Sequence, residues 1–338
     1  MFPLIFLFRL FIATYCESSS FLPVQISAPN VIPKKISHET SEYLEAICGR
    51  PPPFVRQKNG SSQDYPWAVS VMVKGRNKLG GVIISPYHIL TAAHPFIKSN
   101  TLFGDTPCNN QSRYRTISEL QERVVVYGGK CIRGKHKTLP NHTLCDKSDV
   151  AHNSIRLVLV DGGFLQNNCR KGHDWAVIEV RNPIRFGTFT RPICLPEISQ
   201  AIQRKLMVFG WGRKNVFFEA DPYIREIPML HDAFCSPPWS DKMPTDVDDY
   251  ICTVAVSPTD YTTPRTCYGD SGSGMEQRDK TGKATLIGIT SFGSKGCPPN
   301  ELARFTRVDR YLEPICAFTG VCYTVYNHYL LMNNIGHH

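Results

Sequence analysis

Residues 266–274 read TCYGDSGSG, a glycine-rich stretch with a serine between an aspartate and a glycine. A serine hydroxyl attacks carbonyl groups only when a base lies within hydrogen-bond reach and a third group orients that base. Backbone N–H donors must also meet the oxyanion that forms, and a turn at Gly269 lets the N–H groups of Gly269 and Ser271 converge on one point. GDSG alone also fits an ordinary turn. The rest of the sequence therefore has to supply a base and its orienting group.

Two other segments contain candidates for these groups. Residues 81–94 read GVIISPYHILTAAH, and the small residues before His94 let this histidine sit close against other backbone. Residues 173–180 read HDWAVIEV, in which Asp174 opens an apolar strand. The sequence thus holds a histidine and an aspartate in strand-and-turn segments well separated from Ser271.

Eight short motifs follow one another along the chain in this order: PWAVSV, TAAH, DWAVI, RPICLP, GWG, CYGDSGSG, SFGSKGC and FTRV. Together they resemble chymotrypsin/trypsin-like serine peptidases over about Cys48 to Cys316, and the departures described below are typical of a divergent secreted branch such as the nematode trypsin-like proteins. The resemblance implies an all-β fold of two six-stranded antiparallel β-barrels with the active site between them, followed by a C-terminal α-helix. The pattern of short β-branched segments by itself predicts only a mostly-β chain.

By this resemblance His94 is the general base, Asp174 orients it, and Ser271 is the nucleophile. The oxyanion hole is expected from the N–H groups of Gly269 and Ser271. Asp149 in SDVAH also precedes Val-Ala, but Asp174 is preferred because its strand leads into PICLP at family-like spacing. No metal or organic cofactor is expected, and the expected partners are protein or peptide substrates.

The N-terminus and the cysteines predict an extracellular protein. The apolar run MFPLIFLFRLFIATY is too short for a membrane span and fits a signal peptide over residues 1–16. Of 13 cysteines, an even number remains once Cys16 is removed, as is typical of disulfides in an oxidising compartment. N-x-S/T sequons at Asn59, Asn110 and Asn141 predict a glycoprotein.

Composition excludes some other classes of protein. The 338 residues are 42% hydrophobic and 20% charged, which is typical of a globular chain. The net charge of +9 is spread without a long basic run or an aromatic-basic repeat, so a nucleic-acid partner is not expected. No later segment is apolar and long enough to predict a membrane span.

We predict four consecutive parts: a signal peptide over 1–16, a propeptide over 17–56, the peptidase domain over 57–316 and a tail over 317–338. In the propeptide, residues 17–36 are expected to be extended and residues 37–47 to form a short helix capped by Ser37 or Thr40. Residues 99–170 hold four cysteines and little clear periodicity, and they are interpreted partly as a large disulfide-pinned insertion.

The resemblance implies three disulfides, which would attach the propeptide, close a loop and tie the pocket walls: Cys48–Cys194, Cys235–Cys252 and Cys267–Cys297. Two further family pairs lack both members, at Leu79 with Pro95 and at Leu206 with the region of Glu276–Gln277. The pairing of the other cysteines stays open: Cys108, Cys131, Cys145, Cys169, Cys316 and Cys322.

Activation is the first departure from the family pattern. The resemblance implies a zymogen in which an activating protease cleaves after Arg56, and the new N-terminal ammonium then pairs with Asp270. The new chain would begin at Gln57, which lacks the apolar gain of the usual isoleucine and can cyclise to an uncharged form. A glycan at Asn59 would crowd the site. Without the Gln57–Asp270 ion pair, the oxyanion hole would be left disordered.

The specificity pocket is the second departure. Arg265 stands two residues before Cys267, where trypsins place an aspartate, and Gly293 and Ala303 line the same pocket by resemblance. Cleavage after Lys or Arg is not expected, because a buried like charge would repel the substrate. Two alternatives stay open: Arg265 pairs with an acidic substrate side chain, or it folds away or plugs the pocket.

Together these features predict a secreted serine endopeptidase that hydrolyses peptide bonds through an acyl-enzyme. The alternative is a catalytically silent homologue that acts as a binding or regulatory protein. The complete set of His94, Asp174 and Ser271 favours the enzyme, whereas Gln57 and Arg265 favour the silent homologue.

Overall fold

The computed structural model describes residues 23–50, 65–98, 108, 112–129, 131–132, 150–169, 171–217, 220, 222–236, 243–300 and 302–335. The expected signal peptide, Arg56, Gln57, Asp149 and the three sequons lie outside these ranges. Within them, no helix is long and apolar enough to cross a membrane. The same residues contain no group of three or more metal-ligating side chains arranged to hold an ion.

Six antiparallel strands form the first barrel: β2 (Ala68–Val73), β3 (Arg76–Ile83), β4 (His88–Thr91), β7 (Arg123–Tyr127), β8 (Ala151–Asp161) and β9 (Ala176–Val180). They follow the order β8-β7-β2-β3-β4-β9, and β9 pairs back onto β8 to close the barrel. The branched side chains of these strands suit a pleated surface with one buried face, and Leu79, Val125 and Val158 are fully buried inside.

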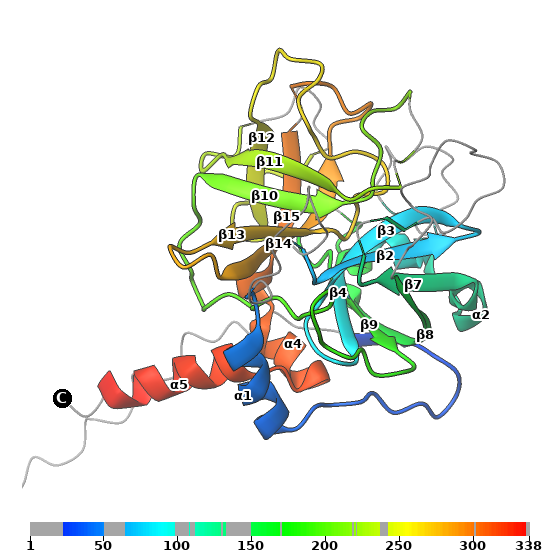
Figure 1. The fold of residues 1–338 in the computed structure, drawn as a ribbon, viewed down its shortest axis with the longest axis vertical. Helices are drawn as coiled ribbons and strands as arrows, with labels where there is room; N and C mark the ends of the chain where they lie inside the picture. Colours follow the sequence, from blue (N-terminus) through cyan, green and yellow to red (C-terminus); the bar gives the residue numbers. More distant parts are fainter. Residues whose placement is uncertain are drawn as a thin grey trace, which may run out of the picture.

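The second barrel is also closed, in the order β10-β11-β12-β15-β14-β13. Its strands are β10 (Lys205–Gly210), β11 (Arg225–His231), β12 (Tyr250–Ala255), β13 (Gly274–Arg278), β14 (Ala284–Gly293) and β15 (Leu302–Arg307). It has its own core around Val208, Ile251 and Phe305. The two barrels meet where β2, β3 and β4 contact β10, β13 and β14 (Figure 1). The predicted pair of six-stranded antiparallel barrels is confirmed.

Residues 99–170, interpreted partly as an insertion, also contain regular secondary structure. Two strands of the first barrel, β7 and β8, lie within this range, together with β6 (Arg113–Tyr114), α2 (Ile117–Gln121) and α3 (Gly162–Gln166). A further short strand, β5 (Ile97–Lys98), pairs with β6. The apolar, β-branched segments ERVVVY (122–127) and SIRLVLV (154–160) correspond to β7 and β8.

The segment before the expected cleavage point is an integral part of the fold. Strand β1 (Pro23–Ile26) pairs with β8 as a seventh strand. Helix α1 (His38–Ile47) is capped by Ser37, whose side chain accepts the Thr40 N–H, so Ser37 is the cap of the two candidates. In Figure 1, α1 lies against α4 (Leu312–Thr319) and α5 (Tyr323–Ile335), and the Cys322 N–H donates to Ser41 at 2.9 Å. The chain therefore ends in two helices instead of the single one expected.

The structure contains the three disulfides implied by resemblance, Cys48–Cys194, Cys235–Cys252 and Cys267–Cys297. Two pairings that the sequence left open are Cys108–Cys169 and Cys316–Cys322. Cys131 is also disulfide-bonded, and Cys145 lies outside the described residues. Cys48–Cys194 thus ties the N-terminal segment to the first barrel's surroundings, and Cys316–Cys322 links α4 to the residue before α5. Several disulfides are typical of extracellular proteins.

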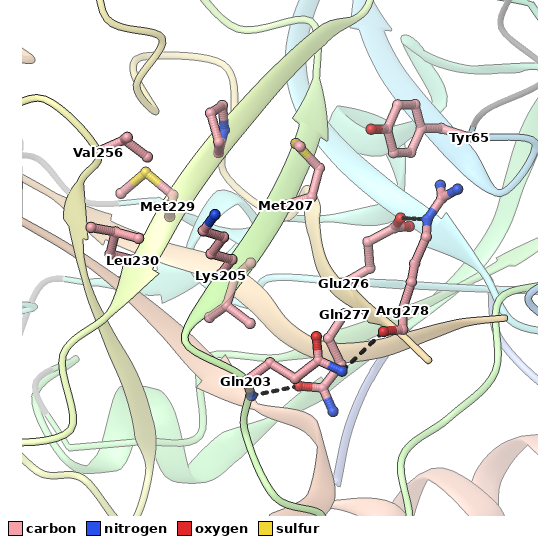
Figure 2. A pocket seen from close by; sticks show the side chains of 12 residues that line it. Tyr65, Gln203, Lys205, Met207, Met229, Leu230, Val256, Glu276, Gln277 and Arg278 are labelled. Atoms are coloured by element: carbon pink, nitrogen blue, oxygen red, sulfur yellow. Dashed lines mark hydrogen bonds and ion pairs between the residues drawn. The ribbon is translucent and has the colours of Figure 1, made fainter. Parts of the chain in front are cut away.

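Hydrogen bonds replace one of the missing family disulfides. Gln277, on β13, accepts the Gln203 N–H at 2.9 Å (Figure 2). Its side-chain amide also donates to the Ala201 carbonyl at 3.0 Å. The neighbouring Glu276 is buried, and it accepts from Trp67 at 3.0 Å and from Arg278 at 2.7 Å. Burial raises the pKa of Glu276 to about 7. These contacts border an open cavity of about 550 Å³ at the edge of the second barrel.

Candidate active site

The pairing of β4 with β9 brings His94 and Asp174 together. Thr91 lies opposite Ala176 in this register, so the chain after β4 runs beside the residues before β9. His94 Nδ1 lies 2.9 Å from Asp174 Oδ2. The other carboxylate oxygen accepts the N–H groups of Ala93 and His94 at 2.9 and 2.8 Å. Both the imidazole and the backbone before it are therefore fixed by one aspartate.

The surroundings of Asp174 keep it ionised. The Asp174 side chain is fully buried, whereas the His94 side chain is 32% exposed. Burial alone would raise the pKa of Asp174, but the charge of His94 and hydrogen bonds from His94 and Ser291 hold it below its ordinary value. An ionised carboxylate at Nδ1 keeps the proton on that nitrogen and leaves Nε2 of His94 as the acceptor. This pairing favours the tautomer that a general base needs.

The loop that carries Ser271 packs against the strand that leads to His94. The Gly80 N–H donates to the Ser271 carbonyl at 2.7 Å, and the Gly272 N–H donates to the Thr290 carbonyl at 2.9 Å. Gly272 has a φ of +77°, and a Cβ there would lie 2.1 Å from Thr91 Oγ1, so only glycine allows this approach. Ser271 therefore lies in a segment that adjoins both β4 and β14.

Gly269 and Ser271 both carry backbone N–H groups on the same tight loop. The Gly269 carbonyl is held by the side-chain amide of Asn77 at 2.9 Å, and φ at Gly269 is +97°. Neither the Gly269 N–H nor the Ser271 N–H donates to any residue that the structure describes. Two free N–H groups on one tight loop are the arrangement that binds an oxyanion.

Arg265 is turned into the protein's own loops. It is 4% exposed, and its Nε donates to the Cys297 carbonyl at 2.7 Å. Nη1 donates to the carbonyls of Tyr261 and Thr263, each at 3.0 Å. Of the two alternatives left open by the sequence, this geometry favours the folded-away side chain. On the facing pocket strands, Gly293 lies opposite Ala303.

Arg225 is the site residue that sequence reasoning missed. Its Nη2 lies 2.5 Å from Asp270 Oδ2, in the place where pairing with Gln57 was expected. Gln57 lies outside the described residues. In the structure Arg225 opens β11 and pairs in register with Gly210 of the GWG motif. Nothing in the sequence pattern alone distinguishes Arg225 from the other basic residues.

Two antiparallel barrels, with a histidine paired to a buried aspartate and a GDSG loop at their junction, define a serine-protease architecture of the chymotrypsin class. Residues 54–315 match the family model described as Trypsin, and the chain belongs to this family.

Several curated proteins are similar to this chain over most of its length. "Trypsin-like protease try-5" of Caenorhabditis elegans is 27% identical, over 75% of this chain and 83% of the relative. "Clotting factor G beta subunit" of Tachypleus tridentatus is 25% identical, over 80% of this chain and 81% of the relative. "CLIP domain-containing serine protease B15" of Anopheles gambiae is 27% identical, over 74% of this chain but only 65% of the relative.

Proposed function

We propose that this protein is a secreted serine endopeptidase. The observation that carries the proposal is the 2.9 Å contact between His94 Nδ1 and buried Asp174, formed beside the loop that holds Ser271. A histidine oriented in this way can deprotonate a serine hydroxyl, and few other functions require that arrangement. Family membership supports the same reading.

In the proposed reaction, Ser271 Oγ attacks the carbonyl carbon of the scissile bond while His94 Nε2 takes the hydroxyl proton. The N–H groups of Gly269 and Ser271 donate to the oxyanion of the tetrahedral intermediate. His94 then gives its proton to the leaving amine, and an acyl-enzyme on Ser271 remains. A water molecule, deprotonated by His94, releases the acyl group and restores the serine. Asp174 keeps the imidazole in position and stabilises its charged form.

For the pocket, we propose selectivity for an uncharged side chain before the scissile bond. Arg265 donates three hydrogen bonds to carbonyl groups of the protein, so an acidic substrate would have to displace them. The positive charge of Arg265 disfavours Lys and Arg. Gly293 and Ala303 add no charge of their own.

We further propose that the N-terminal segment stays attached if the chain is cleaved after Arg56. The disulfide Cys48–Cys194 crosses the proposed cleavage point. Strand β1 and helix α1 add non-covalent contacts with β8 and α5. Secretion is supported by the apolar N-terminus and by the disulfides.

A library of peptides with varied sequence tests both the activity and the specificity. The secreted chain is expected to cleave library members after uncharged residues, and Ser271→Ala is expected to cleave none, as mass spectrometry of the products will show. Cleavage after Asp or Glu would support pairing with Arg265 instead. Cleavage after Lys or Arg would contradict the proposed pocket. A folded wild-type chain that cleaves nothing, before or after cleavage at Arg56, would favour the silent homologue.

A further inference from the structure

The carboxylate next to the proposed nucleophile is already paired within the chain. Asp270 is fully buried, and Arg225 Nη2 lies 2.5 Å from its Oδ2. Its Oδ1 accepts the Gly212 N–H at 2.8 Å, and Oδ2 also accepts the Cys267 N–H at 2.9 Å. All these partners belong to the body of the second barrel and its loops, and none comes from the new N-terminus that cleavage would create.

Arg225 also contacts residue 265, at the other end of the segment 265–270 that contains Asp270. Its Nη1 donates to the Arg265 carbonyl at 3.3 Å. One guanidinium therefore contacts both residue 265 and residue 270, which flank the oxyanion donor Gly269. Since β11 is a barrel strand paired with β10, this clamp is anchored in rigid structure.

The Arg225 cation offsets the cost of burying a charge on Asp270. Burial raises the pKa of Asp270, against the lowering effect of Arg225 and the two backbone donors. A buried carboxylate that loses its partner is strongly destabilising. A guanidinium is always protonated and forms directional hydrogen bonds, so Arg225 provides this cation without an ammonium group. Asp270 then keeps a cationic partner even though Gln57 is poorly suited to become a buried N-terminus.

We propose that Arg225 is a positioning residue that holds the oxyanion-hole loop in its working geometry before any cleavage at Arg56. The uncut chain is then competent for acylation. This inference rests on the proposed function, because it concerns how the same nucleophile and oxyanion hole become active.

The first test compares uncut and cut full-length protein. Arg56→Gln provides the uncut chain, and wild-type protein with a verified N-terminus at Gln57 provides the cut chain. Labelling by a fluorophosphonate probe is expected at rates that agree within about tenfold, because a missing oxyanion donor would cost about 10²–10³-fold. If only the cut chain labels, the proposed function stands and the inference about Arg225 is overturned. If neither folded form labels, the proposed function itself fails.

The second test changes Arg225 in the uncut chain. Arg225→Met is expected to lower the labelling rate about 10²-fold or more, and Arg225→Lys to restore most of it, because a cation beside Asp270 returns. Arg278→Met is the matched control, since Arg278 also pairs with a buried carboxylate, Glu276, in the same barrel, and both residues lie on β13 and not in the loop that carries Ser271. It is expected to leave the labelling rate unchanged at a temperature where all variants are folded.

Unchanged labelling in folded Arg225→Met would overturn the inference. An equal loss in the Arg278→Met control would do the same, since it would indicate a general effect on stability. If Arg225→Met does not fold, two measurements still test the inference. They are the ratio of labelling rates between the uncut and the cut chain, and the labelling rate of Arg225→Lys.

Discussion

Asp174→Asn is expected to lower kcat for peptide hydrolysis about 10⁴-fold while the protein stays folded. Asparagine keeps an oxygen for the N–H groups of Ala93 and His94, which Asp174 Oδ1 accepts at 2.9 and 2.8 Å. Its amide nitrogen, however, faces His94 Nδ1 and favours the tautomer with the proton on Nε2. That tautomer cannot take the proton of Ser271, and the positive charge that develops on His94 loses its partner.

The measurement is steady-state hydrolysis of a peptide chosen from the library, with melting temperature followed in parallel. KM is expected to change little, because Asp174 is buried behind His94 and touches no substrate. A loss of kcat smaller than about tenfold, in a protein of unchanged melting temperature, would contradict the role assigned to Asp174.

Asp161→Asn is expected to have its main effect on stability, with a loss of about 3–5 kcal/mol in the free energy of unfolding. Asp161 is 1% exposed, and its Oδ2 lies 2.7 Å from His173 Nδ1 and 2.8 Å from Trp175 Nε1. This is a second aspartate–histidine pair with a buried aspartate, and the Asp161 N–H donates to the carbonyl of Trp175, next to Asp174. No hydrogen bond between described residues joins Asp161 to Ser271. Urea unfolding will measure the loss, and kcat of the folded protein is expected to stay within about threefold of wild type.

The cost of Asp161→Asn is expected to depend on pH. The hydrogen bond to Asp161 raises the pKa of His173 above its ordinary value, against the effect of partial burial. A raised pKa in the folded state stabilises the protein below the ordinary value, about 6.5, and this contribution is lost as pH rises through the folded pKa. The variant should therefore lose more stability at pH 5.5 than at pH 9. An equal loss at both pH values would contradict the His173–Asp161 coupling.

The fold was largely predictable because the motifs occur in a recognisable order and the strand segments alternate clearly. Ser37 as helix cap also followed from local chemistry, since a serine side chain can accept the first free N–H groups of a helix. Strands β7 and β8 were visible as the β-branched segments ERVVVY and SIRLVLV, whereas the weak periodicity around them gave no indication of β6, α2 and α3. Strand β1 was not predicted, because a four-residue edge strand depends on its partner β8 and carries little signal of its own.

The candidate site was predictable only where its residues lie in motifs. His94, Asp174 and Ser271 each stand in a recognisable segment, and the structure places His94 and Asp174 in contact. Arg225 lies 45 residues from Asp270 in the sequence, so only the barrel brings them together. The direction of the Arg265 side chain likewise depends on carbonyl groups of loops that a sequence pattern does not position.

The measurement that tests the central claim most directly is mass spectrometry of the secreted chain after reaction with a fluorophosphonate. We predict a single covalent adduct on Ser271, formed by wild type and absent from Ser271→Ala. Such an adduct requires a nucleophilic hydroxyl, a base and an oxyanion hole acting together. No adduct on Ser271 in correctly folded protein, whether uncut or cleaved after Arg56, would contradict the assignment of this chain as a serine endopeptidase.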